Sequence, residues 1–342
     1  MTEVPIIDIA PLVAGGGDVG GVGEALDAAC REAGFFYIEG HGVDPGLRHR
    51  LDDLSRQFFA RPDRDKAEIA MARAGRAWRG WFPVGGELTS GVPDLKEGVY
   101  FGAELSPSHA RVQAGTLLHG ANLFPSEPAE LRQVVLAYLE EMTRVAQTVL
   151  GGIALGLGLD RSWFAGGLTA DPLILFRIFH YPPAPAVDDR WGVGEHTDYG
   201  LLTVLGQDRH GGLQVRSQDG WVDAPPVPGT FVCNLGDMLE RLTGGRYRST
   251  PHRVRNASGA DRLSFPFFLD PSWDAVVDRL PIVPRPDDTG AAERWDHASV
   301  YGFTGTYGDY IVAKVGKVFP VLAAESVAAG RVRMPAVLPG EG

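Results

Sequence analysis

Three stretches of the chain carry apolar residues at the three- and four-residue spacing of an amphipathic helix. They cover residues 21–33, 46–60 and 128–159, and the spacing predicts that each turns one face to a core. We expect the third and longest to support a sheet, with Ser126 as a candidate cap at its start. Its apolar stripe comprises Leu131, Val134, Val135, Tyr138, Leu139, Met142, Val145 and Val149.

The sequence between these helices is more polar. Residues 62–72 predict a charged, exposed helix, and residues 74–91, rich in Gly, Trp and Arg, predict an irregular loop. Within that loop, Trp81 and Phe82 are candidates for a lid over a binding site. Three charged residues that follow are expected to face solvent, as such loop residues usually do: Asp94, Lys96 and Glu97.

Short runs of β-branched and aromatic residues, bounded by Gly and Pro, follow the longest helix. Those within residues 199–237 predict consecutive strands, and strand-rich sequence continues to about Leu269. With two opening strands near the N-terminus, the pattern predicts an α+β fold with a barrel or jelly-roll core. Residues 295–329 predict a loop followed by a helix.

We expect one unit over residues 1–342, because neither an internal repeat nor a low-complexity linker divides the chain. Its regions would be an N-terminal helical and strand part (1–125), the long helix (126–160), the strand core (170–270) and a C-terminal extension with a helix (271–342).

Composition narrows the class of protein. Two cysteines, Cys30 and Cys233, are too few for a disulfide framework and indicate a reducing compartment, so a cytoplasmic protein is expected. A net charge of −11 argues against nucleic acid as a partner. The start of the chain lacks a secretory signal, and the apolar stretch at 149–159 is too short to span a membrane. We expect a monomer or a weak homodimer.

The candidate chemistry lies in the strand-rich part. In a strand, the side chains of His196 and Asp198 point to one face, so both could bind one metal ion. His252 follows Pro251 at the start of another β-branched stretch and offers a third ligand. Two imidazoles and one carboxylate form the facial triad of non-haem Fe(II) oxygenases, which leaves three coordination positions open.

Arg262 and Ser264 form a second pair on one face of a predicted strand, ten residues past the last of these histidines. A guanidinium fork beside a hydroxyl group suits a buried carboxylate, because Arg offers paired donors in a fixed geometry. This pair is therefore a candidate for holding a dicarboxylate cosubstrate.

Several motifs spread over almost the whole chain resemble the isopenicillin N synthase-like branch of the 2-oxoglutarate/Fe(II)-dependent oxygenases. They are Val4-Pro-Ile-Ile-Asp-Ile, Gly34-Phe-Phe-Tyr-Ile-Glu-Gly-His-Gly-Val, Asp94-Leu-Lys-Glu-Gly, Tyr181-Pro-Pro, His196-Thr-Asp, Asn234-Leu-Gly-Asp and Ser249-Thr-Pro-His-Arg-Val. The resemblance implies a double-stranded β-helix (jelly-roll, cupin-like) core flanked by helices.

The resemblance also implies roles for residues. His196, Asp198 and His252 would bind Fe(II), and three others would hold 2-oxoglutarate: Arg262, Ser264 and Tyr181. Plant members commonly carry Asn where this chain has Phe179, whose ring cannot hydrogen-bond the cosubstrate. Phe179 and Phe268 are candidates for substrate contact. The implied reaction consumes 2-oxoglutarate and O₂, releases succinate and CO₂, and oxidises a C–H bond of a small organic substrate.

Hydroxylation is the expected outcome, although desaturation or cyclisation uses the same cofactor. Two alternatives remain open from the sequence. One is an isopenicillin N synthase-type oxidative cyclase, or an ascorbate-using oxidase, that does not need 2-oxoglutarate. The other is a non-catalytic binding protein on the same scaffold.

Overall fold

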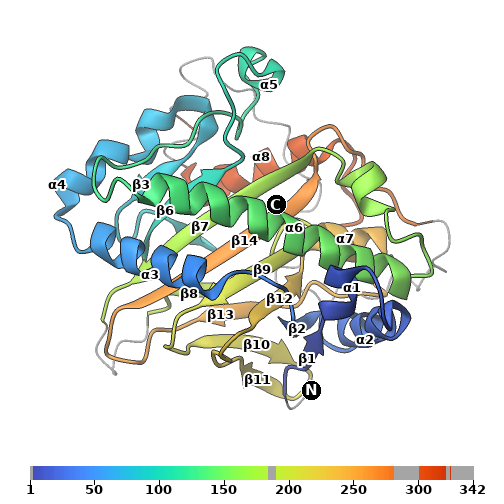
Figure 1. Ribbon diagram of the computed structural model, residues 1–342. Coiled ribbons are helices and arrows are strands. Elements are labelled where there is room, and N and C mark those ends of the chain that lie inside the picture. The colour runs from blue at the N-terminus through green and yellow to red at the C-terminus, as the bar shows by residue number, and fades with distance from the viewer. Residues whose placement is uncertain (1–2, 184–189, 281–299, 321–323, 325–342) are drawn as a thin grey trace.

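The chain folds around two β-sheets in a computed structural model that describes residues 3–183, 190–280, 300–320 and 324 (Figure 1). The larger sheet has the strand order β1-β2-β12-β9-β14-β7-β6-β3, and the smaller has the order β11-β10-β13-β8. The strands are β1 (Ile6–Asp8), β2 (Phe35–Glu39), β3 (Gly80–Phe82), β6 (Glu97–Gly102), β7 (Pro172–Tyr181), β8 (Val193–His196), β9 (Leu202–Gln207), β10 (Leu213–Ser217), β11 (Gly220–Asp223), β12 (Phe231–Leu235), β13 (His252–Val254) and β14 (Arg262–Ser272), with β4 (Leu88–Thr89) and β5 (Val92–Pro93) as a separate pair.

The long central strand β14 is hydrogen-bonded to β7 on one side and β9 on the other, both antiparallel. Strand geometry sends alternate side chains to opposite faces. One face of β14 accordingly lines a cavity between the two sheets, through Arg262, Ser264, Pro266, Phe268 and Asp270. The expected jelly-roll core is confirmed.

Helix α6 (Leu131–Gly156) covers the outer face of the larger sheet and runs across β7, β14 and β9 in Figure 1. Tyr138 packs on Phe176 of β7 with ring centroids 5.1 Å apart, so the predicted supporting helix is confirmed. The predicted cap is wrong, because the helix begins at Leu131 and the Ser126 hydroxyl group donates to Glu68 instead. The other helices are α1 (Ala10–Ala14), α2 (Val19–Glu32), α3 (Pro45–Phe59), α4 (Asp63–Lys66), α5 (Ala110–Gln113), α7 (Asp237–Leu242) and α8 (Tyr307–Val318).

Two predictions for the N-terminal half need correction. Residues 62–72 form only the short α4 and tighter turns rather than one exposed helix, because Lys66 is buried in an ion pair with Glu97. The segment 74–91 is not one irregular loop, since it contains β3 and β4. Both segments approach the larger sheet, and tertiary contacts override their local polarity.

The predicted C-terminal helix is present as α8. The rest of that prediction, at residues 295–299 and beyond 320, lies outside the described residues, apart from the single residue 324. None of the helices in the described ranges is both long and apolar enough to cross a membrane.

Candidate active site

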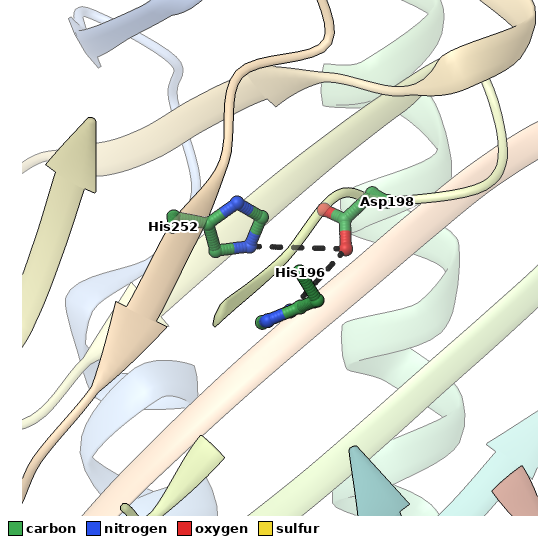
Figure 2. A group of neighbouring side chains, drawn as sticks. All are labelled: His196, Asp198 and His252. Carbon is green, nitrogen blue, oxygen red and sulfur yellow. Dashed lines mark ion pairs between the residues drawn. The ribbon is translucent and has the colours of Figure 1, made fainter. Parts of the chain in front are cut away.

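Three side chains point toward one another in Figure 2, and all three line the same cavity. His196 ends β8 and His252 begins β13, and the two residues are direct partners in the antiparallel pair. Asp198 follows two residues after β8. One ligand atom from each side chain lies within 4.8 Å of the other two, so a single metal ion could contact all three. The structure thus brings together the three residues that the sequence pattern predicts.

Backbone carbonyl groups orient both imidazoles. Nδ1 of His196 is 2.8 Å from the Gly194 carbonyl oxygen, and Nδ1 of His252 is 3.2 Å from the Thr250 carbonyl oxygen. A hydrogen bond from Nδ1 to a carbonyl oxygen requires the proton to be on Nδ1. In a neutral imidazole the lone pair is then on Nε2. These Nε2 atoms lie 3.9 and 3.8 Å from Asp198 Oδ1, and they converge on the same point as that oxygen.

Two side chains that the sequence pattern did not single out hold Asp198 in place. Thr203 of β9 and Asn234 of β12 both donate hydrogen bonds to Oδ2, and the Asn234 bond measures 2.6 Å. Oδ1 is therefore the oxygen turned toward the histidines. Partners of this kind fix the orientation of a metal-binding carboxylate. Asn234 belongs to one of the motifs found in the sequence, but its hydrogen bond to Asp198 could be identified only in the folded structure.

Burial controls protonation at this site. Burial, with a smaller contribution from His196, lowers the pKa of His252 to about 4. Burial also lowers the pKa of His196. For Asp198, burial acts to raise the pKa, but the two imidazoles and the hydrogen bonds together hold it below its ordinary value. Near neutral pH all three groups offer lone pairs, the state that metal binding requires.

The cavity beside the three ligands has a volume of about 390 Å³ and lies between the two sheets. Arg262 and Tyr181, which are paired residues on β14 and β7, both line it. The Tyr181 hydroxyl group is 3.3 Å from Ser264 Oγ. The three residues expected to bind 2-oxoglutarate are thus neighbours on the cavity wall.

Arg262 has the geometry of a carboxylate clamp. Its side chain is completely buried, with Nε donating to the Gly211 carbonyl oxygen at 3.0 Å and Nη2 to Gln207 at 3.4 Å. Nη1 has no hydrogen-bond partner among the residues that the structure describes. A buried donor without a partner is costly, and a carboxylate in the cavity would satisfy it. The residues present therefore fit 2-oxoglutarate.

The aromatic predictions have different outcomes. Phe179 and Phe268 both line the cavity, where we expected substrate contact. Trp81 and Phe82 are buried and do not line it, and the Trp81 indole donates to Glu97 at 2.7 Å. The predicted lid is therefore wrong for these two residues. The nearby segment that does border the cavity is 87–91, which includes β4.

The expectation of solvent exposure is wrong for Asp94, Lys96 and Glu97, which are all buried. Lys96 pairs with Asp94 and with Glu87, whose Oε2 lies 2.9 Å from Nζ. Glu97 pairs with Lys66 at 2.7 Å. Charged groups tolerate burial when oppositely charged partners compensate them, and these partners come from different segments. Lys96 and Glu87 line the cavity wall.

Two further cavity residues were missed in the sequence, Arg177 of β7 and Asp270 of β14. Arg177 interrupts an apolar strand and stands four residues before Tyr181. Its side chain therefore lies on the same face of the strand as that of Tyr181, because the two are an even number of residues apart. This spacing could have identified Arg177 from the sequence. Asp270 carried no comparable signal, because a carboxylate near a strand end usually faces water.

A jelly roll that brings two histidines, one carboxylate and a buried arginine together in a cavity defines a mononuclear non-haem iron oxygenase. Comparison with known proteins agrees. Residues 173–271 match the 2OG-Fe(II) oxygenase superfamily, and residues 4–127 match the family described as non-haem dioxygenase in morphine synthesis N-terminal. The chain belongs to the 2OG-Fe(II) oxygenase superfamily, whose chemistry uses Fe(II), 2-oxoglutarate and O₂.

Relatives span nearly the whole chain. A probable iron/ascorbate oxidoreductase of Dictyostelium discoideum is 46% identical, covering 88% of this chain and 90% of the relative. A homoarginine-6-hydroxylase of Arabidopsis thaliana is 35% identical, covering 92% and 96%. The crystal structure of a full-length Neurospora crassa protein in complex with alpha-KG (2-oxoglutarate) is similar with a TM-score of 0.76 and 26% identity, covering 92% and 96%. The chain is therefore a 2-oxoglutarate-dependent dioxygenase by family.

Proposed function

We propose that His196, Asp198 and His252 bind the Fe(II) of a 2-oxoglutarate-dependent hydroxylase that acts on a small organic molecule. The observation that carries this proposal is that three lone-pair donors converge in one cavity. The wall of that cavity also holds Arg262, whose Nη1 has no partner in the part of the chain that the structure describes. Hydroxylation is supported by the Arabidopsis relative, which is named as a hydroxylase.

Bound iron with 2-oxoglutarate would supply the activation of O₂ for oxidation of a C–H bond, which no amino-acid side chain can perform. Two histidines and one carboxylate bind one face of the ion and leave the other positions to cosubstrate and O₂. Arg262, Ser264 and Tyr181 orient the far carboxylate of the cosubstrate. Phe179 and Phe268 exclude water from the space between this clamp and the substrate.

An ascorbate-using oxidase without 2-oxoglutarate is the second candidate, because the Dictyostelium relative is named as a probable iron/ascorbate oxidoreductase. The clamp around Arg262 favours the 2-oxoglutarate reaction. The two candidate reactions can be distinguished by their products, since only the 2-oxoglutarate reaction forms succinate. All three candidate metal ligands are present, which argues against a non-catalytic binding protein on the same scaffold.

We also propose that the protein is cytoplasmic and is a monomer or a weak homodimer. Cys30 and Cys233 are both buried free thiols, which is compatible with a reducing compartment. Sedimentation velocity over a range of concentrations would test the oligomeric state, and a tight dimer would contradict it.

Anaerobic titration with Fe(II) and 2-oxoglutarate tests the assignment directly. The wild-type protein should develop the visible charge-transfer band of iron-chelated 2-oxoglutarate. His252→Ala should abolish the band, and Arg262→Ala should require at least about tenfold more 2-oxoglutarate, because a buried charge-assisted pair is lost. Iron binding without the band in the wild type would favour the ascorbate-using alternative.

A further inference from the structure

The floor of the cavity has two ends, set by the pairing of β7 with β14. Tyr181 and Arg262 face each other at the cosubstrate end. Arg177 lies four residues from Tyr181 on the same face of β7, which corresponds to about 13 Å of strand. That distance places Arg177 outside the cosubstrate clamp.

The candidate metal ligands lie toward the other end of this floor, beyond Arg177 along the strands. Asp198 is hydrogen-bonded to Thr203, and Thr203 is the partner of Phe268 on β14. Asp270 lies two residues further along β14. A Cβ atom added at Gly200 would collide with Asp270 Oδ1, so this carboxyl group lies against the loop that carries Asp198. The part of the cavity near Arg177 and Phe268 therefore lies beside the metal ligands and away from the cosubstrate clamp, which makes it the substrate end.

Arg177 is held in place mainly by two aromatic rings, together with a long ion pair to Glu87. Its guanidinium lies 4.2 Å from the ring centre of Tyr100 and 4.8 Å from that of Phe268. Nη1 is 3.6 Å from Glu87 Oε1, which exceeds hydrogen-bond distance, and Nε has no partner within the described parts of the chain. Two aromatic faces thus position a cation whose donors remain available to a ligand.

The carboxylates nearby are already engaged. Glu87 accepts from the Tyr100 hydroxyl group and pairs with Lys96 at 2.9 Å. Asp270 accepts a hydrogen bond from Tyr307 of α8 at 2.5 Å. On the opposite wall, α8 also contributes Lys314, whose ammonium group lies 5.9 Å from the ring centre of Tyr199. The available charge at the substrate end is positive.

The structure assigns Arg177 as the residue that binds a carboxylate group of the substrate, so the substrates are small organic acids, amino acids included. The assignment rests on the proposed function. A guanidinium presents paired N–H donors that match the two oxygens of a carboxylate. A carboxylate bound there would leave the rest of the molecule over Phe268 and Tyr199, both of which line the cavity.

A panel of carboxylic acids, each paired with its primary amide, tests this assignment. The panel includes L-homoarginine, other amino acids, and aromatic and aliphatic acids. Each compound is added to wild-type enzyme with Fe(II), 2-oxoglutarate and O₂, and succinate release is measured against a sample without it. We expect stimulation by acids and at least tenfold weaker stimulation by the matching amides.

The variants Arg177→Met and Arg177→Lys separate recognition from folding. Met should lower kcat/KM for the stimulating acid about 100-fold, mainly through KM, because the carboxylate loses a charged partner. Lys should recover part of the loss, since it keeps the charge but not the fork. Both should still form the anaerobic charge-transfer band, which shows that the fold and the cosubstrate site are intact. Arg50→Met, at an exposed arginine of α3, is the matched control and should behave as the wild type.

Amides that stimulate as well as their acids would overturn the assignment. So would a Met variant with unchanged KM for the acid, or a panel in which no acid stimulates while the band forms normally. Absence of the band in the wild type would overturn the proposed function and this assignment with it.

Discussion

At the scale of single residues, the candidate metal site depends on which atoms are left without partners. Backbone carbonyl groups engage Nδ1 of His196 and His252, while Thr203 and Asn234 engage one oxygen of Asp198. What remains is one nitrogen or oxygen per residue, all aimed at a common point. The site is therefore oriented before any metal ion binds, which lowers the cost of binding.

Asn234→Ala should weaken Fe(II) binding about 10- to 100-fold, because Asp198 loses one of the two donors that fix its orientation. Anaerobic equilibrium dialysis of the apoprotein against Fe(II) would measure the change. Gln113→Ala is the control, since it removes an exposed side-chain amide of α5 that donates to the Pro107 carbonyl oxygen, and it should leave the affinity unchanged. Equal affinities in the Asn234 variant and the wild type would contradict this role.

Asp270→Asn should change how stability depends on pH. Burial raises the pKa of Asp270 to about 7, so the folded protein keeps this proton to higher pH than the unfolded chain, whose carboxyl group titrates near pH 4. The contribution of this group to stability is complete below about pH 4 and is lost as the pH rises to about 7. As the pH rises across this window, the free energy of unfolding of the asparagine variant should therefore increase relative to that of the wild type, by about 1.4 kcal/mol per pH unit.

Urea unfolding of both apoproteins at several values between pH 4 and pH 8 would measure this difference. A free-energy difference that stays constant over the range would show that Asp270 titrates normally.

At the scale of elements, the C-terminal helix completes the cavity from outside the two sheets. Helix α8 and the residue after it contribute Ile311, Val315 and Phe319 to the cavity lining, and two tyrosines of the helix bond buried carboxylates. Tyr307 donates to Asp270, and Tyr310 donates to Asp237 at 3.1 Å. A helix far from the metal ligands in sequence thereby shapes the substrate end.

Tyr307→Phe should destabilise the protein by about 1–3 kcal/mol at pH 8, because the ionised Asp270 would lose its hydrogen-bond donor. The cost should shrink at pH 5, where that carboxyl group is protonated, because a neutral carboxyl group is less costly to bury without a donor than a carboxylate is. Denaturant unfolding at the two pH values would measure both effects, and an equal cost at both would contradict the pairing with Asp270.

At the scale of the whole molecule, the cavity joins parts that meet only in the folded state. The metal ligands come from the smaller sheet and its adjoining loop, whereas Arg262 and Tyr181 come from the larger one. Ligands that bridge these parts bind the native state and not the unfolded chain. Binding therefore adds to the free energy of unfolding.

Fe(II) together with 2-oxoglutarate should stabilise the wild-type protein under anaerobic conditions by about 2.7 kcal/mol when 2-oxoglutarate is at about 100 times its Kd. Thermal unfolding with and without the two ligands would measure this, and EDTA should reverse it. His196→Ala should show almost no gain. A gain of the same size in that variant would indicate binding at another site.

The sequence by itself determined the class of fold, the long supporting helix and the identity of the metal-binding candidates. It could do so because strand and helix periodicities are local, and because the spacing of His196, Asp198 and His252 stands within recognisable motifs. Only the tertiary structure decided that Lys66, Lys96 and Glu97 are buried, and that Asp270 lines the cavity. Whether a charged side chain lies in water or in a cavity depends on partners that are distant in sequence, and local patterns carry no record of those partners.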